Sequence, residues 1–154
     1  MAISALSAGR AICELRDWKV SNLELQKILY LAHMFHLGEH EGAPLISENF
    51  EAWEYGPVVP SLYRQARGFG SGPVRNVFHW IPGVSEGSEL AMLREASNAT
   101  SGMSAGRLVS ITHWPRGAWH KKYQPGVRGI VIPNELILEE FRERAAAPNQ
   151  QNAG

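Results

Sequence analysis

The sequence predicts a mainly α fold, a compact single helical domain with a minimal two-stranded β element. Three observations support this class. Apolar residues recur at helical spacing in several separate stretches, a serine–glutamate pair can cap the longest of them, and Gly-Pro pairs or glycine clusters separate them. The 154 residues suit one domain. We place it at residues 1–144 and expect a disordered tail over 145–154, because no large apolar residue occurs there.

The N-terminal part contains the two most regular helical patterns. Apolar residues at roughly helical spacing predict a first helix over residues 3–16. A second helix begins after Ser21, because the Ser21 hydroxyl and the Glu24 carboxylate can each accept a free backbone N–H of the other. This helix should run to about Glu39, and its apolar residues cover nearly the whole circumference. We therefore expect it to be buried on most sides.

The middle of the chain alternates between short extended and helical patterns. Residues 45–53 alternate loosely between apolar and polar, which favours a short strand. After a Gly-Pro corner, residues 58–67 show a helical pattern with Pro60 in the first turn, where the missing N–H leaves no hydrogen bond unmade. Residues 74–81 are β-branched and aromatic and stop at a Pro-Gly pair, so we predict a second brief strand there.

The C-terminal half is predicted to be mostly helical. Apolar spacing predicts a helix over residues 86–98, and Ser104 is a suitable N-cap for another that runs to about Thr112. Residues 114–126 are aromatic but irregular. A terminal helix is predicted from Pro133, because proline and acidic residues are both favoured in a first turn.

Charge and cysteine content argue against several classes of protein. Fifteen basic residues balance fifteen acidic ones, whereas proteins that wrap nucleic acid usually carry a basic excess. Cys13 is the single cysteine of the sequence, so an internal disulfide is excluded and a reducing compartment is expected. The N-terminus lacks a signal-peptide pattern, and no stretch approaches ~18 consecutive apolar residues. We therefore predict a cytoplasmic protein with no membrane partner.

The histidines are the main candidates for metal binding or catalysis. His33, His36 and His40 follow one face of the second helix, but no Cys pair or further ligand motif accompanies them. His113 and His120 flank tryptophans, and a hydrolase that uses either one as a general base in an aromatic pocket is an alternative function. No nucleophile elbow or phosphate-binding loop is present. We predict no catalytic residue, no metal and no cofactor.

Residues 51–63 form the most informative segment, because they combine aromatic side chains with two prolines. Each proline fixes its own φ and restricts the preceding residue, so the segment loses little freedom on binding. Tyr, Trp and Arg dominate interface hot spots. We predict a partner-binding surface made of Trp53, Tyr55, Gly56, Pro57, Val58, Pro60, Tyr63, Arg64, Trp114 and Trp119. The alternative is that the tryptophans fill the core and only Tyr55 is exposed.

Three motifs follow one another along the chain. The first is Asn22-Leu-x-Leu-Gln-Lys-Ile-Leu-Tyr30, followed by Ala32 and His36. The second is Glu51-Ala-Trp-x-Tyr-Gly-Pro-Val-Val-Pro-x-Leu-Tyr63. The third comprises Thr112-His113, Trp119, Tyr123 and Ile132-Pro-Asn-Glu135. In this order they resemble the Panacea domain found in SocA-like antitoxins and phage-associated GepA proteins. Two departures affect the last motif: Trp114-Pro-Arg-Gly replaces a usually more polar link, and His120 stands where an Asp commonly follows the tryptophan.

The resemblance implies a non-enzymatic antitoxin that binds and neutralises a cognate protein toxin. SocA-like members also act as proteolytic adaptors that deliver the bound toxin to the ClpXP protease, which would make the ClpX unfoldase a second partner. Different Panacea domains pair with unrelated toxins, so the resemblance does not identify this toxin. The balanced charge argues against nucleic acid as a partner. A DNA-binding autoregulator with a basic patch on Arg64, Arg67 and Arg75 is a further alternative.

Overall fold

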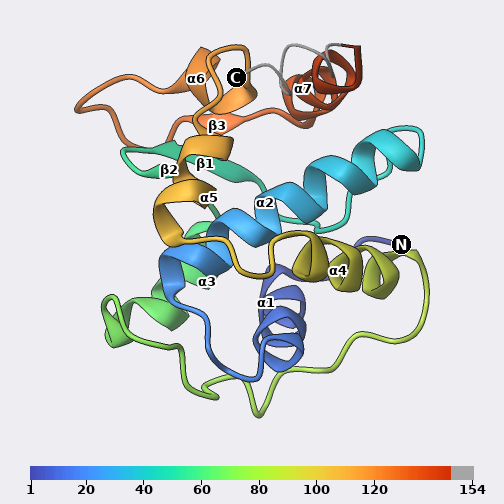
Figure 1. Ribbon diagram of the computed structural model, residues 1–154, viewed down its shortest axis with the longest axis vertical. Helices are drawn as coiled ribbons and strands as arrows, with labels where there is room; N and C mark the ends of the chain where they lie inside the picture. The colour runs from blue at the N-terminus through green and yellow to red at the C-terminus, as the bar shows by residue number, and fades with distance from the viewer. Residues whose placement is uncertain (147–154) are drawn as a thin grey trace.

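The central element of the fold is α2, which spans Asn22–Glu39 (Figure 1). The computed structural model describes residues 1–146. In the view of Figure 1, α1 (Ala5–Leu15), α3 (Pro60–Ala66) and α4 (Ser88–Ala99) lie below α2, while a small sheet, α6 (Ala118–Lys122) and α7 (Asn134–Ala146) lie above it. α5 (Ala105–Thr112) contacts both α2 and the sheet. The structure confirms the predicted mainly α class.

The capping box at the start of α2 forms as predicted. The backbone N–H of Glu24 donates to Ser21 Oγ at 3.2 Å, and the Ser21 N–H donates to Glu24 Oε1 at 2.9 Å. α2 is buried on most sides because other helices and the sheet contact it along its length. The buried set includes polar side chains as well as apolar ones, among them Lys27 and His33. These buried polar side chains therefore need hydrogen-bond partners inside the protein.

The sheet has three antiparallel strands in the order β2-β1-β3. β1 (Phe50–Trp53) and β2 (Gly56–Val58) form a tight hairpin in which Ala52 pairs with Pro57. β3 (Val131–Ile132) comes from far along the chain and pairs with the other side of β1. The predicted short strand over residues 45–53 is thus present as β1, but its hairpin partner is β2 at residues 56–58, and β3 adds a third strand. Pro57 is compatible with β2 because β2 is an edge strand, where one missing N–H is tolerated.

The predicted strand over residues 74–81 is wrong. Side chains of this segment do enter the core, including Val74 and Phe78, which are fully buried. Two of its carbonyls, however, are bound by a side chain: the Arg10 guanidinium of α1 donates to the carbonyl of Phe78, at 3.2 Å, and to that of Ile81. The apolar pattern was therefore a signal of burial, and the hydrogen bonds that would define a strand go to an arginine instead.

Several helix boundaries differ from the sequence-based ones. α3 begins at Pro60, because residues 56–58 form β2 before it, and a short 3₁₀ turn, η1 (Arg67–Phe69), follows it. The irregular stretch over residues 114–126 contains the short helix α6. α7 continues through Ala145 and Ala146, two residues assigned by sequence to the tail. The rest of the predicted tail, residues 147–154, lies outside the described residues.

The core joins α2 to the sheet and to the lower helices. The rings of Tyr30 in α2 and Phe50 in β1 meet edge to face, with centroids 5.2 Å apart. Cys13 of α1 is completely buried, and burial raises the pKa of its thiol to about 12. A thiol in this environment is a small apolar core residue and a poor nucleophile. Within residues 1–146, no helix combines the length and apolar character needed to span a bilayer.

Candidate partner-binding site

The Gly-Pro corner at the start of β2 is held in place by α2. The side-chain carbonyl of Gln26 accepts the Val59 N–H at 3.0 Å, and Lys27 Nζ donates to the Pro57 carbonyl at 3.1 Å. Gly56 has a φ of +117°, and a Cβ at this position would lie 2.9 Å from Lys27 Nζ. Both the backbone conformation and the close approach of Lys27 therefore require glycine. The corner is a rigid support for the residues on either side of it.

Lys27 is an unusual support because its side chain is completely buried. Burial lowers the pKa of Lys27 to about 7, since the ammonium loses its hydration and no carboxylate contacts it within residues 1–146. The lysine is therefore close to the balance between its charged and neutral forms near neutral pH. Its one hydrogen bond within the described residues goes to the Gly-Pro corner.

Three rings stack behind the hairpin. The imidazole of His113 lies flat on Trp119, with centroids 3.8 Å apart and planes 7° apart, and Tyr123 stacks on the same indole at 4.8 Å. The Trp119 indole N–H donates to the Trp53 carbonyl at 2.7 Å, which ties α6 to β1. Burial is the main cause that lowers the pKa of His113, and the charge of Lys27 acts in the same direction. The stack fixes the aromatic residues of two separate motifs against each other.

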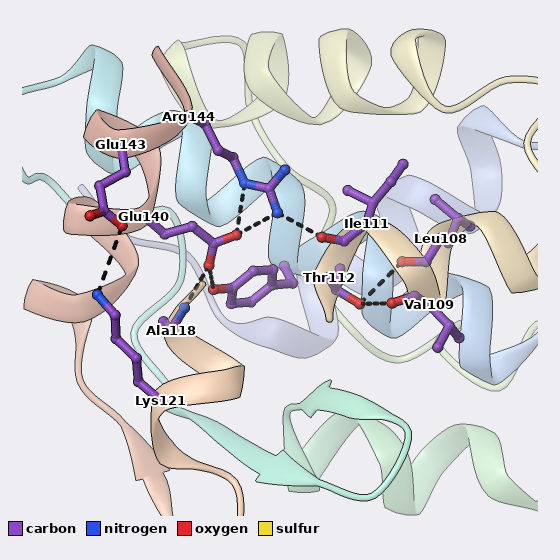
Figure 2. Close-up of polar contacts among 10 residues, drawn as sticks. Leu108, Val109, Ile111, Thr112, Ala118, Lys121, Glu140, Glu143 and Arg144 are labelled. Atoms are coloured by element: carbon purple, nitrogen blue, oxygen red, sulfur yellow. Dashed lines mark hydrogen bonds and ion pairs between the residues drawn. The ribbon is translucent and has the colours of Figure 1, made fainter. Parts of the chain in front are cut away.

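A buried carboxylate fastens α7 to α2, α5 and α6 (Figure 2). Glu140 of α7 is fully buried and accepts hydrogen bonds from the Tyr30 hydroxyl at 2.6 Å and the Ala118 N–H at 2.9 Å. Its other oxygen accepts from the Arg144 guanidinium at 2.8 Å, and Arg144 also donates to the Ile111 carbonyl at 2.6 Å. Burial, together with the charge of Glu140, raises the pKa of Tyr30 well above its usual value, so Tyr30 remains a donor. The network completes the scaffold behind the aromatic stack.

The ten residues predicted for the surface separate into exposed and buried groups. Tyr55, in the hairpin turn, is 64% exposed. Trp53, Pro60, Tyr63 and Arg64 line an open groove of about 880 Å³. Trp114 is half-buried under the guanidinium groups of Arg116 and Arg144, at 5.0 and 4.7 Å from its ring centroid.

The buried group corrects the predicted surface. Gly56, Pro57, Val58 and Trp119 are buried, so these four are not accessible to a partner in this structure. That the other six bind a partner stays a prediction. The physical reason is that α2 and the ring stack occupy the space on the inner side of the hairpin. The alternative, in which the tryptophans fill the core and only Tyr55 is exposed, fits Trp119 but not Trp53, which lines the groove.

Some residues that shape this site were not predicted. The loop over residues 125–129 and Tyr123 also line the groove, as do Arg67 and Arg128 together with Arg64. Lys27 and Glu140, which hold the scaffold, were not identified either. For Lys27 a signal was present, since a charged residue within an almost wholly apolar helix indicates a specific buried partner. For the loop no local pattern indicates which strand and helix it faces.

The histidines considered for metal binding or catalysis have other contacts. His33 hydrogen bonds to Asn134 Oδ1 at 2.9 Å and accepts from the Ile46 N–H at 3.4 Å, while His36 contacts the Ala43 carbonyl and Ser88 Oγ. Residues 1–146 contain no cluster of three or more potential metal ligands. The Nε2 atom of His113 is buried without a hydrogen-bond partner among the described residues, and His120 is exposed on α6. Both rings contact Trp119, at 3.8 and 6.4 Å between centroids, and neither histidine lines the groove.

Comparison with known proteins identifies the family. The family model described as "Antitoxin SocA-like, Panacea domain" matches residues 25–120, a region that contains most of α2, the hairpin and the His113–Trp119 pair. The chain is also 34% identical over 140 residues to "Antitoxin SocA" of Caulobacter vibrioides (strain NA1000 / CB15N), an alignment that covers 82% of this chain and 74% of that relative. No solved structure is significantly similar to the chain. The chain therefore belongs to the SocA-like antitoxin family with a Panacea domain.

Proposed function

We propose that this protein is the antitoxin of a toxin–antitoxin pair and that it binds and neutralises a cognate protein toxin. Its membership of an antitoxin family is the observation that carries the proposal. The arrangement of the hairpin supports it, because the exposed Tyr55 and the half-buried Trp53 and Tyr63 of the groove lie on a backbone held by Gln26, Lys27 and the ring stack. A rigid aromatic surface of this kind binds a partner at a low cost in conformational entropy.

Neutralisation is proposed to begin with binding of the toxin. The toxin would bind to the face formed by Tyr55 and the groove residues. The complex would cover the region of the toxin that is responsible for its toxicity. Aromatic and arginine side chains are the residue types that contribute most at such interfaces. The proposal requires no reaction step and assigns none to the histidines.

The test is co-expression with the product of the neighbouring reading frame. That product should stop growth when expressed alone, and co-expression of this chain should restore growth. Tyr55→Ala should weaken the purified complex by about 2 kcal/mol, or roughly thirtyfold in Kd, if the ring is a hot spot. Trp80→Ala is the matched control, because Trp80 is 61% exposed but lies outside the hairpin and groove. A neighbouring product that is harmless alone would refute the antitoxin proposal.

A finer proposal concerns the fate of the toxin. The resemblance to SocA-like antitoxins supports a role as a proteolytic adaptor that delivers the bound toxin to ClpXP. Purified ClpX and ClpP should then degrade the toxin in the presence of this chain and ATP, and leave it intact when the chain is omitted. A toxin that stays intact although growth is restored would mean that the chain acts as a simple blocker.

A further inference from the structure

The groove beside the hairpin has a composition that selects a particular kind of ligand. Its walls come from three parts of the chain: β1 and the hairpin turn, α3 with η1, and the loop over residues 125–129. In Figure 1 this loop, between α6 and β3, extends on the same side of the molecule as the hairpin turn. The volume of about 880 Å³ is within the ~300–1,000 Å³ usual for ligand pockets.

The apolar part of the groove is preorganised. Trp53 and Tyr63 meet edge to face, with centroids 4.8 Å apart, and the Trp53 indole N–H donates to Glu51 Oε1 at 3.0 Å. Tyr123 is held by its stacking on Trp119. Val127, at the loop tip, is 46% exposed. These fixed rings and the exposed valine offer a surface for one large apolar side chain.

The charged part of the groove carries an excess of arginine. Arg64, Arg67 and Arg128 line it, all three are exposed, and none makes a side-chain hydrogen bond or ion pair with another residue of the described chain. Two carboxylates, Glu51 and Glu54, also line the groove, and one oxygen of Glu51 is already bonded to Trp53. Three unpaired guanidinium groups thus face two carboxylates in a protein with a net charge of zero. Guanidinium groups bind carboxylates in a bidentate geometry, with two parallel N–H···O hydrogen bonds.

We propose that this groove binds an acidic segment of a partner protein, with one large apolar side chain of that segment against Trp53, Tyr63 and Val127. The proposal rests on the proposed function, since the partner would be the toxin. A protein segment is favoured over nucleic acid because Glu51 and Glu54 would repel a continuous phosphate backbone, whereas carboxylates of a peptide can be spaced to avoid them. Charge complementarity of this kind steers association and makes it sensitive to salt.

The first experiment measures binding of the toxin to charge-reversed variants. Arg64→Glu combined with Arg67→Glu should weaken the purified complex by about tenfold or more and reduce its dependence on salt. The control, Arg75→Glu with Arg107→Glu, changes net charge equally at exposed arginines outside the groove and should alter Kd by less than about twofold. Thermal unfolding of both variants should match that of the natural chain. If both pairs of substitutions weaken the complex equally, or if neither pair weakens it, the groove proposal is wrong and the antitoxin proposal still stands.

The second experiment does not depend on the toxin. A synthetic peptide of aspartates and glutamates around one phenylalanine is titrated into labelled protein and followed by NMR. The expected result is a shift of the Trp53 indole resonance and of the amides in residues 125–129, which the Arg64→Glu/Arg67→Glu variant abolishes. A peptide with lysines in place of the acids should cause no shift. If a DNA duplex shifts these resonances and the acidic peptide does not, the groove is a nucleic-acid surface and the proposal is wrong.

The two experiments separate the two proposals. Binding of the acidic peptide in the groove, together with a neighbouring gene product that is harmless and does not bind, would support the groove and refute the antitoxin function. Toxin binding that is insensitive to the groove arginines, together with no peptide shift, would support the antitoxin function and place its interface elsewhere.

Discussion

Glu140 shows how one buried charge is accommodated in this protein. A carboxylate without exposure is costly unless charged or polar groups satisfy both of its oxygens. Here the Tyr30 hydroxyl and the Ala118 N–H bond one oxygen, while Arg144 bonds the other. The residues come from three helices, so the energy of the site depends on α2, α6 and α7 being correctly placed together. Loss of the charge should therefore loosen the scaffold behind the aromatic stack.

We predict that Glu140→Gln destabilises the protein by about 3 kcal/mol. The substitution removes the buried counter-charge of Arg144, and the side-chain NH₂ of the glutamine would face one of the groups that now donate to Glu140. Glu139→Gln is the matched control: it removes a neighbouring carboxylate that is half exposed and pairs with Lys121. Its effect should stay within about 0.5 kcal/mol. Urea denaturation measures both. Similar values for the two variants would contradict the role assigned to Glu140.

At the scale of elements, the contact between α2 and α7 depends on a glycine inside a helix. Gly38 is in the last turn of α2, and a Cβ added there would overlap the ring of Phe141 from α7. The same ring packs edge to face on Phe35, one turn earlier in α2, at 6.2 Å. Glycine is usually unfavourable in a helix interior. Its presence here permits the close approach of the two helices.

We predict that Gly38→Ala destabilises the protein by about 2 kcal/mol, since overlap with Phe141 outweighs the gain in helix propensity. Gly106→Ala is the control, because Gly106 is also helical but a Cβ there has its nearest neighbour at 4.0 Å. That substitution should be neutral or slightly stabilising. The difference can be measured by thermal unfolding with calorimetry. A stabilising Gly38→Ala would show that α7 can shift without penalty.

At the scale of the whole molecule, two basic side chains, His33 and Lys27, are buried in the core. Burial lowers the pKa of His33 to about 4 and that of Lys27 to about 7. Both groups are neutral in the folded state over a pH range in which the unfolded chain would bind a proton. Their contribution to stability is present above the unfolded pKa and is lost as pH falls through the folded pKa. For His33 this range is pH 6.5 to about 4, and for Lys27 it is pH 10.5 to about 7.

We predict that the free energy of unfolding falls by up to about 3 kcal/mol between pH 6.5 and pH 4 because of His33. His33→Gln should flatten this part of the curve, whereas His79→Gln removes an exposed histidine and serves as control. Lys27→Met should in turn flatten the slope between pH 7 and pH 10.5. Urea denaturation across this pH range measures all four proteins. An unchanged acid slope in His33→Gln would assign the acid sensitivity to other groups.

Much of the helical framework followed from local sequence. The capping box of α2, the Ser104 cap of α5 and the extent of α1 were predicted because each depends on residues within about one or two turns. The failures share a different cause. Val74, Phe78 and Ile81 are buried although their segment is not a strand, and Arg10 binds the carbonyls of Phe78 and Ile81. The third strand depends on a partner far along the chain. Neither of these long-range contacts produces a recognisable pattern in the local sequence.

For the candidate site, the sequence determined which residues are rigid and aromatic and which family they resemble, because proline geometry and motif order are properties of the chain itself. The tertiary structure alone decided which of those residues are accessible. Packing of α2 against Gly56 and Pro57 and stacking around Trp119 bury one side of the segment, and the loop over 125–129 turns the other side into a groove. The exposure of a residue depends on which other parts of the chain pack against it, and these parts are distant in the sequence.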